Sequence, residues 1–391
     1  MTAPSQDTRG DILVHVFGRT DVGRTREHNE DCFVVADLTT MNATLQPEVR
    51  THRPGALGSL FMVADGMGGA AAGEIASEMA TQVVLAELDA KWRPSAVTDA
   101  DAFSMALRRA VEAANTSIHK YALEHPEFRG MGTTTTIAGV LGDALYLCQV
   151  GDSRGYLVRN GVATQITKDQ SLVQRLIDAG ELTPEEAEVS ERRNIILQAL
   201  GPELTVKVDV TMQPLRRGDT LVLCSDGMSG QMRIDDISRI VGESPDLMAT
   251  CKNLIDLANE NGGPDNITVI TARFEGEGLR AADAADTVGH RPYVSPAENR
   301  PTMPVEAASV RKSMEALDAL EQSTVPTAEL EVPEERGYSS GTFARRDTTP
   351  IAPAVPSVGS PRVTVAELRM IFGGLAIAVG AWLAWLYLLR R

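Results

Sequence analysis

The chain has 391 residues, enough for one large domain with appended segments or for two domains. With 43% hydrophobic and 23% charged residues, it has the composition of a globular protein. Its 37 Lys and Arg against 53 Asp and Glu give a net charge of −16, which argues against nucleic-acid binding because phosphate backbones need a basic surface. The four cysteines form no C-x-x-C pair, so we expect neither a thiolate zinc site nor a disulfide framework. We therefore expect the protein to work in the reducing cytosol.

Short apolar runs alternate with longer helical stripes in the first half of the chain. Residues 32–37 and 59–65 are rich in β-branched and aromatic side chains, which predicts buried strands. Apolar residues recur at i, i+4 and i+8 along 74–88, and a longer stripe runs from 103 to 121, so both segments are predicted helices. A further apolar run at 143–150 predicts a third strand.

Helix signals come first in the second half, followed by two more strands. A helix is predicted from about Ser171, with Gly180 placed to end it. Residues 183–186, Thr-Pro-Glu-Glu, have the pattern of a capping box with proline in the first helical position. The runs 219–225 and 266–274 predict strands. Too many strands adjoin one another for strict β-α-β alternation, which favours an α+β domain of antiparallel sheets with helical layers.

The composition changes near residue 275, and we take that as the end of a domain spanning residues 10–275. Residues 276–366 contain ten of the twenty prolines and few aromatic side chains. Such a segment has too little apolar surface to offset the entropy lost on ordering. We therefore expect 276–366 to be a disordered, proline-rich linker.

Residues 370–389 contain no charged side chain and would span about 30 Å as a helix, the thickness of a hydrocarbon core. Two Trp and one Tyr in the last turns, followed by Arg390 and Arg391, are typical of a membrane interface. We expect a single transmembrane helix. Two arginines flank the predicted span on each side, so the distribution of charge does not predict its orientation in the membrane. We expect the large domain in the cytosol because the first residues show no secretory signal pattern.

Three aspartates stand at the ends of strand-like runs or in tight turns beside them: Asp65 in VADGMGG, Asp226 in LCSDGMS and Asp265 in GGPDNIT. A carboxylate at a strand end projects over the edge of its sheet. Asp-Gly is also a common turn, so any one of the three alone would carry little weight. Together they favour a functional cluster.

Carboxylates gathered at one rim repel one another unless a cation neutralises them. Oxygen ligands of this kind select Mg²⁺ or Mn²⁺ over zinc, and the six histidines form no H-E-x-x-H pair. A pair of such ions can make a water nucleophilic near neutral pH. The sequence therefore predicts a divalent-cation site built from carboxylates.

The segment RTREHNED places Arg26 close to Glu30 and Asp31. A guanidinium grips a phosphate through two parallel hydrogen bonds. An acidic chain would repel such an anion unless an arginine and metal ions reverse the local field. The alternative is a surface salt bridge between Arg26 and Glu27 or Glu30.

In these motifs the chain resembles the metal-dependent serine/threonine protein phosphatases of the 2C type (the PPM family) in their bacterial form. The motifs occur in family order across residues 10–275: DVGRTREHNED, FMVADGMGG, MGTTTT, VGDSRGY, the flap-like SLVQRLIDAGELTPEEA, RRNIILQALG, CSDGM and GGPDNIT. The resemblance implies an α+β fold, a four-layer α-β-β-α sandwich of two antiparallel sheets flanked by helix pairs, with a binuclear Mn²⁺ or Mg²⁺ centre at one rim.

The resemblance also implies a set of metal ligands. Asp65 would bridge the two ions, Gly66 would lend its carbonyl, and Asp226 and Asp265 would complete the set. Asp152 of GDSRG, with Asp226, would form the weaker third metal site found in many members.

Further roles follow from the same resemblance. Glu30 and Asp31 would act mainly through bound waters, and Asn266 would orient Asp265. Arg26 would bind the substrate phosphate and, with Asp65 and Asp226, carry catalysis. A metal-bridged hydroxide would attack phosphorus in line, without a covalent phosphoenzyme.

Three positions depart from the family pattern. Met67 stands where several eukaryotic relatives have a histidine proposed as general acid. Gly230 replaces an acid that supports the third metal site in some members. Gln170 replaces a histidine common in bacterial relatives just before the flap.

Two rival functions fit parts of the sequence. Residues 148–154, Cys-Gln-Val-Gly-Asp-Ser-Arg, match the C-x-x-G-x-x-R loop of cysteine-dependent phosphatases. We reject that function because the apolar run before Cys148 and the nearby Asp152 raise a thiol pKa, whereas that chemistry needs a low one. The second rival is a membrane-tethered pseudophosphatase that binds without turnover; the retained acids argue against it.

By resemblance, the substrates are phosphoserine and phosphothreonine proteins, with a cognate membrane serine/threonine kinase as a plausible target. Together with the predicted span, this implies a single-pass protein of the cell membrane with a cytoplasmic catalytic domain. A tether would raise the effective concentration of the enzyme toward other membrane-bound proteins.

Overall fold

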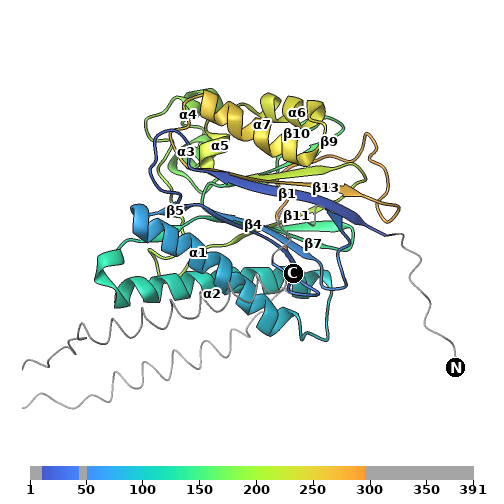
Figure 1. Cartoon of the computed structure of the whole chain (residues 1–391), viewed down its shortest axis with the longest axis horizontal. Helices are drawn as coiled ribbons and strands as arrows, with labels where there is room; N and C mark the ends of the chain where they lie inside the picture. Colours follow the sequence, from blue (N-terminus) through green and yellow to red (C-terminus); the bar gives the residue numbers. More distant parts are fainter. Residues whose placement is uncertain (1–10, 44–50, 296–391) are drawn as a thin grey trace, which may run out of the picture. The chain divides into compact units, whose positions relative to one another are not determined.

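Two antiparallel β-sheets stack face to face between two layers of helices in the computed structural model, which describes residues 11–43 and 51–295 (Figure 1). The first sheet, sheet A, has the strand order β10-β9-β12-β13-β1-β3. Its strands are β10 (Val162–Gln165), β9 (Arg154–Arg159), β12 (Thr220–Cys224), β13 (Ile267–Glu275), β1 (Leu13–Asp21) and β3 (Thr51–His52).

The second sheet, sheet B, has the strand order β11-β8-β7-β4-β2. Its strands are β11 (Asp209–Pro214), β8 (Ala144–Val150), β7 (Thr135–Leu141), β4 (Ser59–Ala64) and β2 (Cys32–Asp37). Every pair of neighbouring strands in both sheets is antiparallel. A small ribbon of β5 (Gly66–Met67) and β6 (Gly132–Thr133) follows β4. The predicted α+β class with antiparallel sheets is confirmed.

A pair of long helices covers the outer face of each sheet (Figure 1). Helices α1 (Ala70–Glu87) and α2 (Ala100–Glu124) lie on sheet B, joined by the π-helical turn η1 (Leu88–Trp92). Helices α6 (Ile234–Glu243) and α7 (Leu247–Glu260) lie on sheet A. The shorter helices are η2 (Pro126–Phe128), α3 (Leu172–Asp178), α4 (Pro184–Glu188) and α5 (Asp226–Ser229).

Three apolar layers hold the four structural layers together, because strand side chains alternate between the two faces of a sheet. In β4, Leu60 and Met62 pack under α1 and α2, whereas Phe61 and Val63 pack between the sheets. A third cluster, including Val222 and Cys251, lies between sheet A and its helices. Both faces of each sheet are therefore buried, which explains why these strands appeared in the sequence as continuous apolar runs.

Local signals predicted the flap region well. Ser171 caps α3 by accepting a hydrogen bond from the backbone N–H of Gln174, and Gly180 follows that helix with a φ of 72°. Thr183 and Glu186 form the predicted capping box at the start of α4. These contacts are local, so they depend little on the rest of the fold.

The packed structure continues beyond residue 275, so the predicted start of the linker is wrong. Residues 276–295, which we call the C-terminal strap, lie against the domain: Leu279 is fully buried between the sheets, and Arg216 Nη2 donates to Asp286 Oδ1 at 2.6 Å. The strap has only four large apolar side chains, Leu279, Val288, Tyr293 and Val294, so the composition of residues 276–366 as a whole favours disorder. The strap is anchored by a few specific contacts that composition does not reveal.

The far end of the strap runs along β11, at the edge of sheet B. The backbone N–H of Tyr293 donates to the carbonyl of Val210 at 2.8 Å, and the Tyr293 hydroxyl donates to Asp101 Oδ1 at 2.5 Å. His290 Nε2 lies 2.7 Å from Asp209 Oδ2. The strap thus connects the end of β13 in sheet A to the outer strand of sheet B.

The predicted linker beyond the strap, residues 296–366, and the predicted membrane span 370–389 lie outside the described residues. Within the described ranges, no helix has the length and hydropathy needed to cross a bilayer. The linker and the membrane span therefore stay predictions.

Replacing Leu279 should distinguish a packed strap from a linker. We expect Leu279→Ala in the full chain to lower stability by about 2–5 kcal/mol, with a fall in Tm of roughly 5 °C or more, because it leaves a cavity between the sheets. Val294→Ala is the matched control, since Val294 in the same strap is 55% exposed and should change stability little. Equal Tm values for the two variants, measured by circular dichroism, would contradict the packing of the strap.

Candidate active site

Sheet B brings two of the predicted acids together. Asp65 directly follows β4, and Asp31 directly precedes β2. The two strands are antiparallel neighbours in which Cys32 pairs with Ala64, so the start of β2 and the end of β4 meet at the same edge. Residues far apart in the sequence thus reach one rim of the sandwich.

Sheet A supplies two more acids at the same rim. Asp226 opens α5 just after β12, and Asp265 lies two residues before β13. The end of β12 and the start of β13 are adjacent, since Cys224 pairs with Val269. Asp152 lies in the turn between β8 of sheet B and β9 of sheet A.

The five acids influence one another electrostatically across the two sheets. Removal from bulk water raises the pKa of Asp65 well above its usual range, and the charges of Asp31, Asp226, Asp152 and Asp265 raise it further. Burial and the charge of Asp265 also raise the pKa of Asp226, although a hydrogen bond with Asp65, which requires one of the two carboxyl groups to be protonated, opposes the shift. The sequence prediction that these side chains converge is therefore supported by the structure.

Other members of the cluster show the same effect. Burial raises the pKa of Asp31 to about 7, although hydrogen bonds from Thr268 and Ser225 oppose the shift. Burial and the charge of Asp226 raise the pKa of Asp152 to about 7. Each shift means that this rim disfavours negative charge unless a cation is supplied.

The donor set fits a hard divalent cation. It consists of carboxylate oxygens, and Asp31 Oδ1 and Asp152 Oδ1 are buried without a hydrogen-bond partner among the described residues. Across residues 11–43 and 51–295, no three Asp, Glu, His or Cys side chains are grouped closely enough to hold an ion as they stand. Three of the acids already interact with a neighbour: Asp226 with Asp65, and Asp265 with Arg26. The individual ligand roles stay predictions.

Gly66 and Gly73 allow the chain to pass close to the acids. A Cβ at Gly66 would lie 2.4 Å from the carbonyl oxygen of Gly73 and 2.5 Å from that of Glu30. A Cβ at Gly73 would lie 1.9 Å from Glu30 Oε2. The backbone approach at Gly66, the predicted carbonyl ligand, therefore requires glycine.

Arg26 lies at the border of the acid cluster. Its Nη2 donates to Asp265 Oδ2 at 2.8 Å, so the salt-bridge partner is Asp265 and neither of the alternatives Glu27 and Glu30. Its side chain is 48% exposed, and its charge lowers the pKa of Glu30 in opposition to burial, which raises that pKa. The guanidinium is thus both accessible and close to the carboxylates.

Asn266 organises the loop that carries Arg26 and Glu30. Its Oδ1 accepts from the backbone N–H of Glu30 at 2.8 Å, while its Nδ2 donates to the carbonyls of Val22 and His28. Its backbone N–H donates to Asp265 Oδ1 at 2.8 Å. Only the backbone N–H of Asn266 contacts Asp265, while its side chain holds the loop, so the orienting role of Asn266 stays a prediction.

Two supporting hydroxyls and one ion pair were not singled out from the sequence. Thr268 Oγ1 donates to Asp31 Oδ2 at 2.6 Å, and Thr134 Oγ1 accepts from the backbone N–H of Asp65 at 3.1 Å. Arg154 donates to both carboxylate oxygens of Asp169 at 2.7–3.1 Å. All three belong to quoted motifs or adjoin them, but only the fold shows their partners.

Gln170 ties the base of the flap to the turn that carries Asp152. Its Oε1 accepts from the backbone N–H of Gly151 at 3.0 Å, and its own N–H donates to the Gly151 carbonyl at 2.9 Å. Its Nε2 donates to the carbonyl of Lys207 at 3.1 Å. Both ends of the side-chain amide of Gln170, a departure from the family pattern, therefore hold this turn in place.

The structure confirms that Cys148 is no nucleophile. It lies inside β8 with no exposed surface, and burial raises the pKa of its thiol to about 12. A thiolate at neutral pH is excluded by that environment. The cysteine-phosphatase alternative is therefore wrong for this chain.

Comparisons with known proteins agree with this geometry. A family model described as protein phosphatase 2C matches residues 48–265. A serine/threonine phosphatase, stp, of Listeria monocytogenes is 38% identical over 257 residues, covering 66% of this chain and 94% of its own. The serine/threonine protein phosphatase PstP of Mycobacterium tuberculosis is 37% identical over 262 residues, covering 67% of this chain and 45% of its own.

Solved structures show the same likeness. The crystal structure of the Mycobacterium tuberculosis phosphatase PstP/Ppp has a TM-score of 0.56 and 38% identity, covering 67% of this chain and 99% of that one. A structure of the PstP catalytic domain in complex with two manganese ions has a TM-score of 0.55 and 37% identity, covering 68% and 99%. The chain therefore belongs to the protein phosphatase 2C family and is a serine/threonine protein phosphatase of the bacterial type.

Proposed function

We propose that the chain hydrolyses phosphoserine and phosphothreonine in proteins with the help of two divalent cations, Mn²⁺ or Mg²⁺, held at the rim acids. The observation that carries the proposal is the convergence of five carboxyl groups from both sheets: burial raises the pKa of Asp65, and the charges of the other four raise it further. Such a cluster needs positive charge at neutral pH. The manganese ions in the related PstP structure support the choice of cation.

Asp65, the carbonyl of Gly66, Asp226 and Asp265 would hold the two ions. Asp152 would serve a weaker third ion together with Asp226, and the orphaned Asp152 Oδ1 supports that role. Bound cations supply the positive charge that polarises a phosphoryl oxygen and makes a water nucleophilic near neutral pH.

The residues around the cluster hold its acids and receive the substrate. Glu30 and Asp31 act through intervening water, with Thr268 fixing the Asp31 carboxylate. Arg26 binds the substrate phosphate. Its guanidinium releases the Asp265 carboxylate and donates instead to phosphate oxygens, which are also negatively charged. Met67 lies in β5 at the position of the histidine in eukaryotic relatives, so protonation of the leaving oxygen is left to water.

The membrane tether is a second part of the proposal. The uncharged run 370–389, its interfacial aromatic residues and the closing arginines support a single span, with the catalytic domain on the cytoplasmic side. Membrane-bound phosphoproteins, among them a serine/threonine kinase, are then the favoured substrates because tethering raises the local concentration.

Asp226→Asn should reduce Mn²⁺-dependent hydrolysis of nitrophenyl phosphate about a thousandfold or more, because it removes a charge that holds the cations. Asp235→Asn is the matched control, since Asp235 is exposed at the start of α6. A chain that only binds phosphoproteins would show no turnover in any variant. Equal activity in wild type and Asp226→Asn would overturn the assignment of the site.

Without divalent cations, stability should fall as the pH rises. The pKa values of Asp31 and Asp152 are about 7 in the folded protein against 3.8 in the unfolded chain. Between about pH 4 and 7 the folded state therefore binds more protons than the unfolded chain. Raising the pH from 5.5 to 7.5 should lower the free energy of unfolding by about 1–2 kcal/mol for each of these carboxyl groups.

The measurement is Tm at pH 5.5 and 7.5 in EDTA, with Asp152→Asn as comparison. The variant should lose less stability over this interval than the wild type, and Mn²⁺ should restore the wild type at pH 7.5. Identical pH dependence in both proteins would contradict the assigned pKa shifts.

Deleting residues 367–391 should leave hydrolysis of a small soluble substrate unchanged. It should slow only the dephosphorylation of phosphoproteins anchored in vesicles, because the deletion removes the proposed tether and no part of the site. Kinetics on nitrophenyl phosphate and on a vesicle-anchored phosphothreonine peptide would test this. Loss of activity on the small substrate would count against a purely tethering role.

A further inference from the structure

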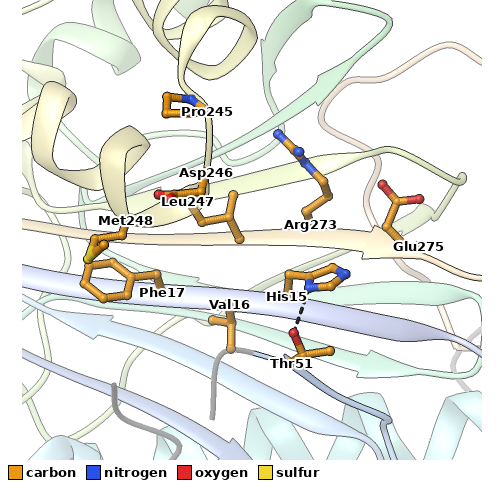
Figure 2. Close-up of a pocket in the computed structure, with 10 residues that line it drawn as sticks. All are labelled: His15, Val16, Phe17, Thr51, Pro245, Asp246, Leu247, Met248, Arg273 and Glu275. Carbon is orange, nitrogen blue, oxygen red and sulfur yellow. Dashed lines mark hydrogen bonds between the residues drawn. The ribbon is translucent and has the colours of Figure 1, made fainter. Parts of the chain in front are cut away.

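A cavity of about 480 Å³ opens on the helix-covered face of sheet A, far from the acid cluster (Figure 2). Its floor comes from β1 and β13, and the start of α7 lies above it. Along β13, Arg273 lies six residues beyond Ile267, the end of the strand next to Asp265. At about 3.4 Å per residue, that separation is roughly 20 Å. The cavity is therefore distinct from the catalytic rim.

A row of polar side chains crosses four strands at this cavity. Thr220 pairs with Arg273, Arg273 with His15, and His15 with Thr51. His15 Nδ1 and Thr51 Oγ1 are 2.8 Å apart (Figure 2). The next row inward, which includes Phe17, belongs to the apolar layer under α6 and α7. The polar row thus marks the point where the helices cease to cover the sheet.

Arg273 is the half-buried cation of this row. Its Nε donates to Thr220 Oγ1 at 3.3 Å, and no carboxylate among the described residues forms an ion pair with it. By contrast, Arg159, two strands away, is paired with Asp219 at 2.6 Å. Arg273 also lines a second hollow of about 280 Å³, together with Thr220 and Glu275. A guanidinium in this setting is well placed to receive a carboxylate.

The rest of the lining is apolar or acidic. Phe17, Leu247 and Met248 form an apolar wall beside the polar row (Figure 2). Glu275 follows Arg273 by two residues on the same strand and also lines the cavity. Its negative charge repels a doubly charged anion such as phosphate more strongly than a singly charged one. Asp246 is already used as the cap of α7, accepting from the backbone N–H of Ala249 at 2.8 Å. These surroundings suit a ligand with one negative charge and an apolar body.

We propose that this cavity is a second binding site, for a small monocarboxylate with an aromatic or branched apolar group. The carboxylate pairs with Arg273, and the apolar group lies against Phe17 and Met248. The volume lies in the range of small-molecule sites, and the mixture of one cation with an apolar wall is typical of them. The proposal is independent of the phosphatase chemistry.

The test uses 3-phenylpropionate as probe and the full chain, with binding followed by calorimetry. Its uncharged amide and inorganic phosphate serve as comparison ligands. We expect the amide to bind about tenfold more weakly or worse, because it lacks the charge-assisted hydrogen bonds, and we expect phosphate not to displace the probe. Equal binding of carboxylate and amide, or displacement by phosphate, would overturn the proposal.

Variants assign binding to this cavity. Arg273→Gln should weaken the probe about tenfold or more, and Arg273→Lys should fall between it and the wild type because lysine keeps the charge without the fork. Arg19→Gln on the same strand face as His15 is the matched control and should bind normally. Circular dichroism verifies that each variant is folded. Binding that survives Arg273→Gln in a folded protein would locate the probe elsewhere and refute the site.

Discussion

Mutual repulsion among buried carboxyl groups is the constraint on which the active site depends. Asp31 and Asp65 come from the edge of sheet B, while Asp226 and Asp265 come from sheet A. Burying these groups together costs free energy, which is visible as the raised pKa of Asp65: burial raises it most, and the neighbouring carboxylates raise it further. A site that binds divalent cations needs this arrangement, because the same repulsion that destabilises the cluster favours the ions that relieve it.

The packing of the two stacked sheets offsets the free energy lost by burying these carboxyl groups. Three apolar layers fix the strands, and the strand ends then place the acids without requiring long ordered loops. Hydrogen bonds finish the placement: Asn266 holds the Glu30 loop, Thr268 holds Asp31, and Gln170 clamps the turn before Asp152. Each supporting group uses neutral donors or acceptors, so the carboxylates keep their charge for cations and substrate.

The two ends of strand β13 in sheet A have different surroundings. Where β12 and β13 meet near Asp226 and Asp265, the sheet presents acids to the catalytic rim. At the other end of β13, the helices stop short of the last polar row, and Arg273 is left at a partly apolar cavity. The C-terminal strap leaves this same end of β13 and crosses to sheet B, so the ordered domain extends past the last strand.

Strands β1, β7, β9 and β11 and helices α6 and α7 are not among the elements predicted from the sequence. The sequence alone predicts the family, the α+β class, five strands, helices α1 to α4 and the candidate rim acids. These follow from local patterns: apolar runs, the capping box at Thr183, and short motifs around Asp65, Asp226 and Asp265. The long-range contacts become visible in the folded protein alone: Arg26 pairs with Asp265, Asn266 holds a distant loop, and residues 276–295 are packed. Those contacts join residues tens to hundreds of positions apart. Composition and periodicity depend only on residues that are close in the sequence, so they cannot predict pairings that form when whole strands and layers come together.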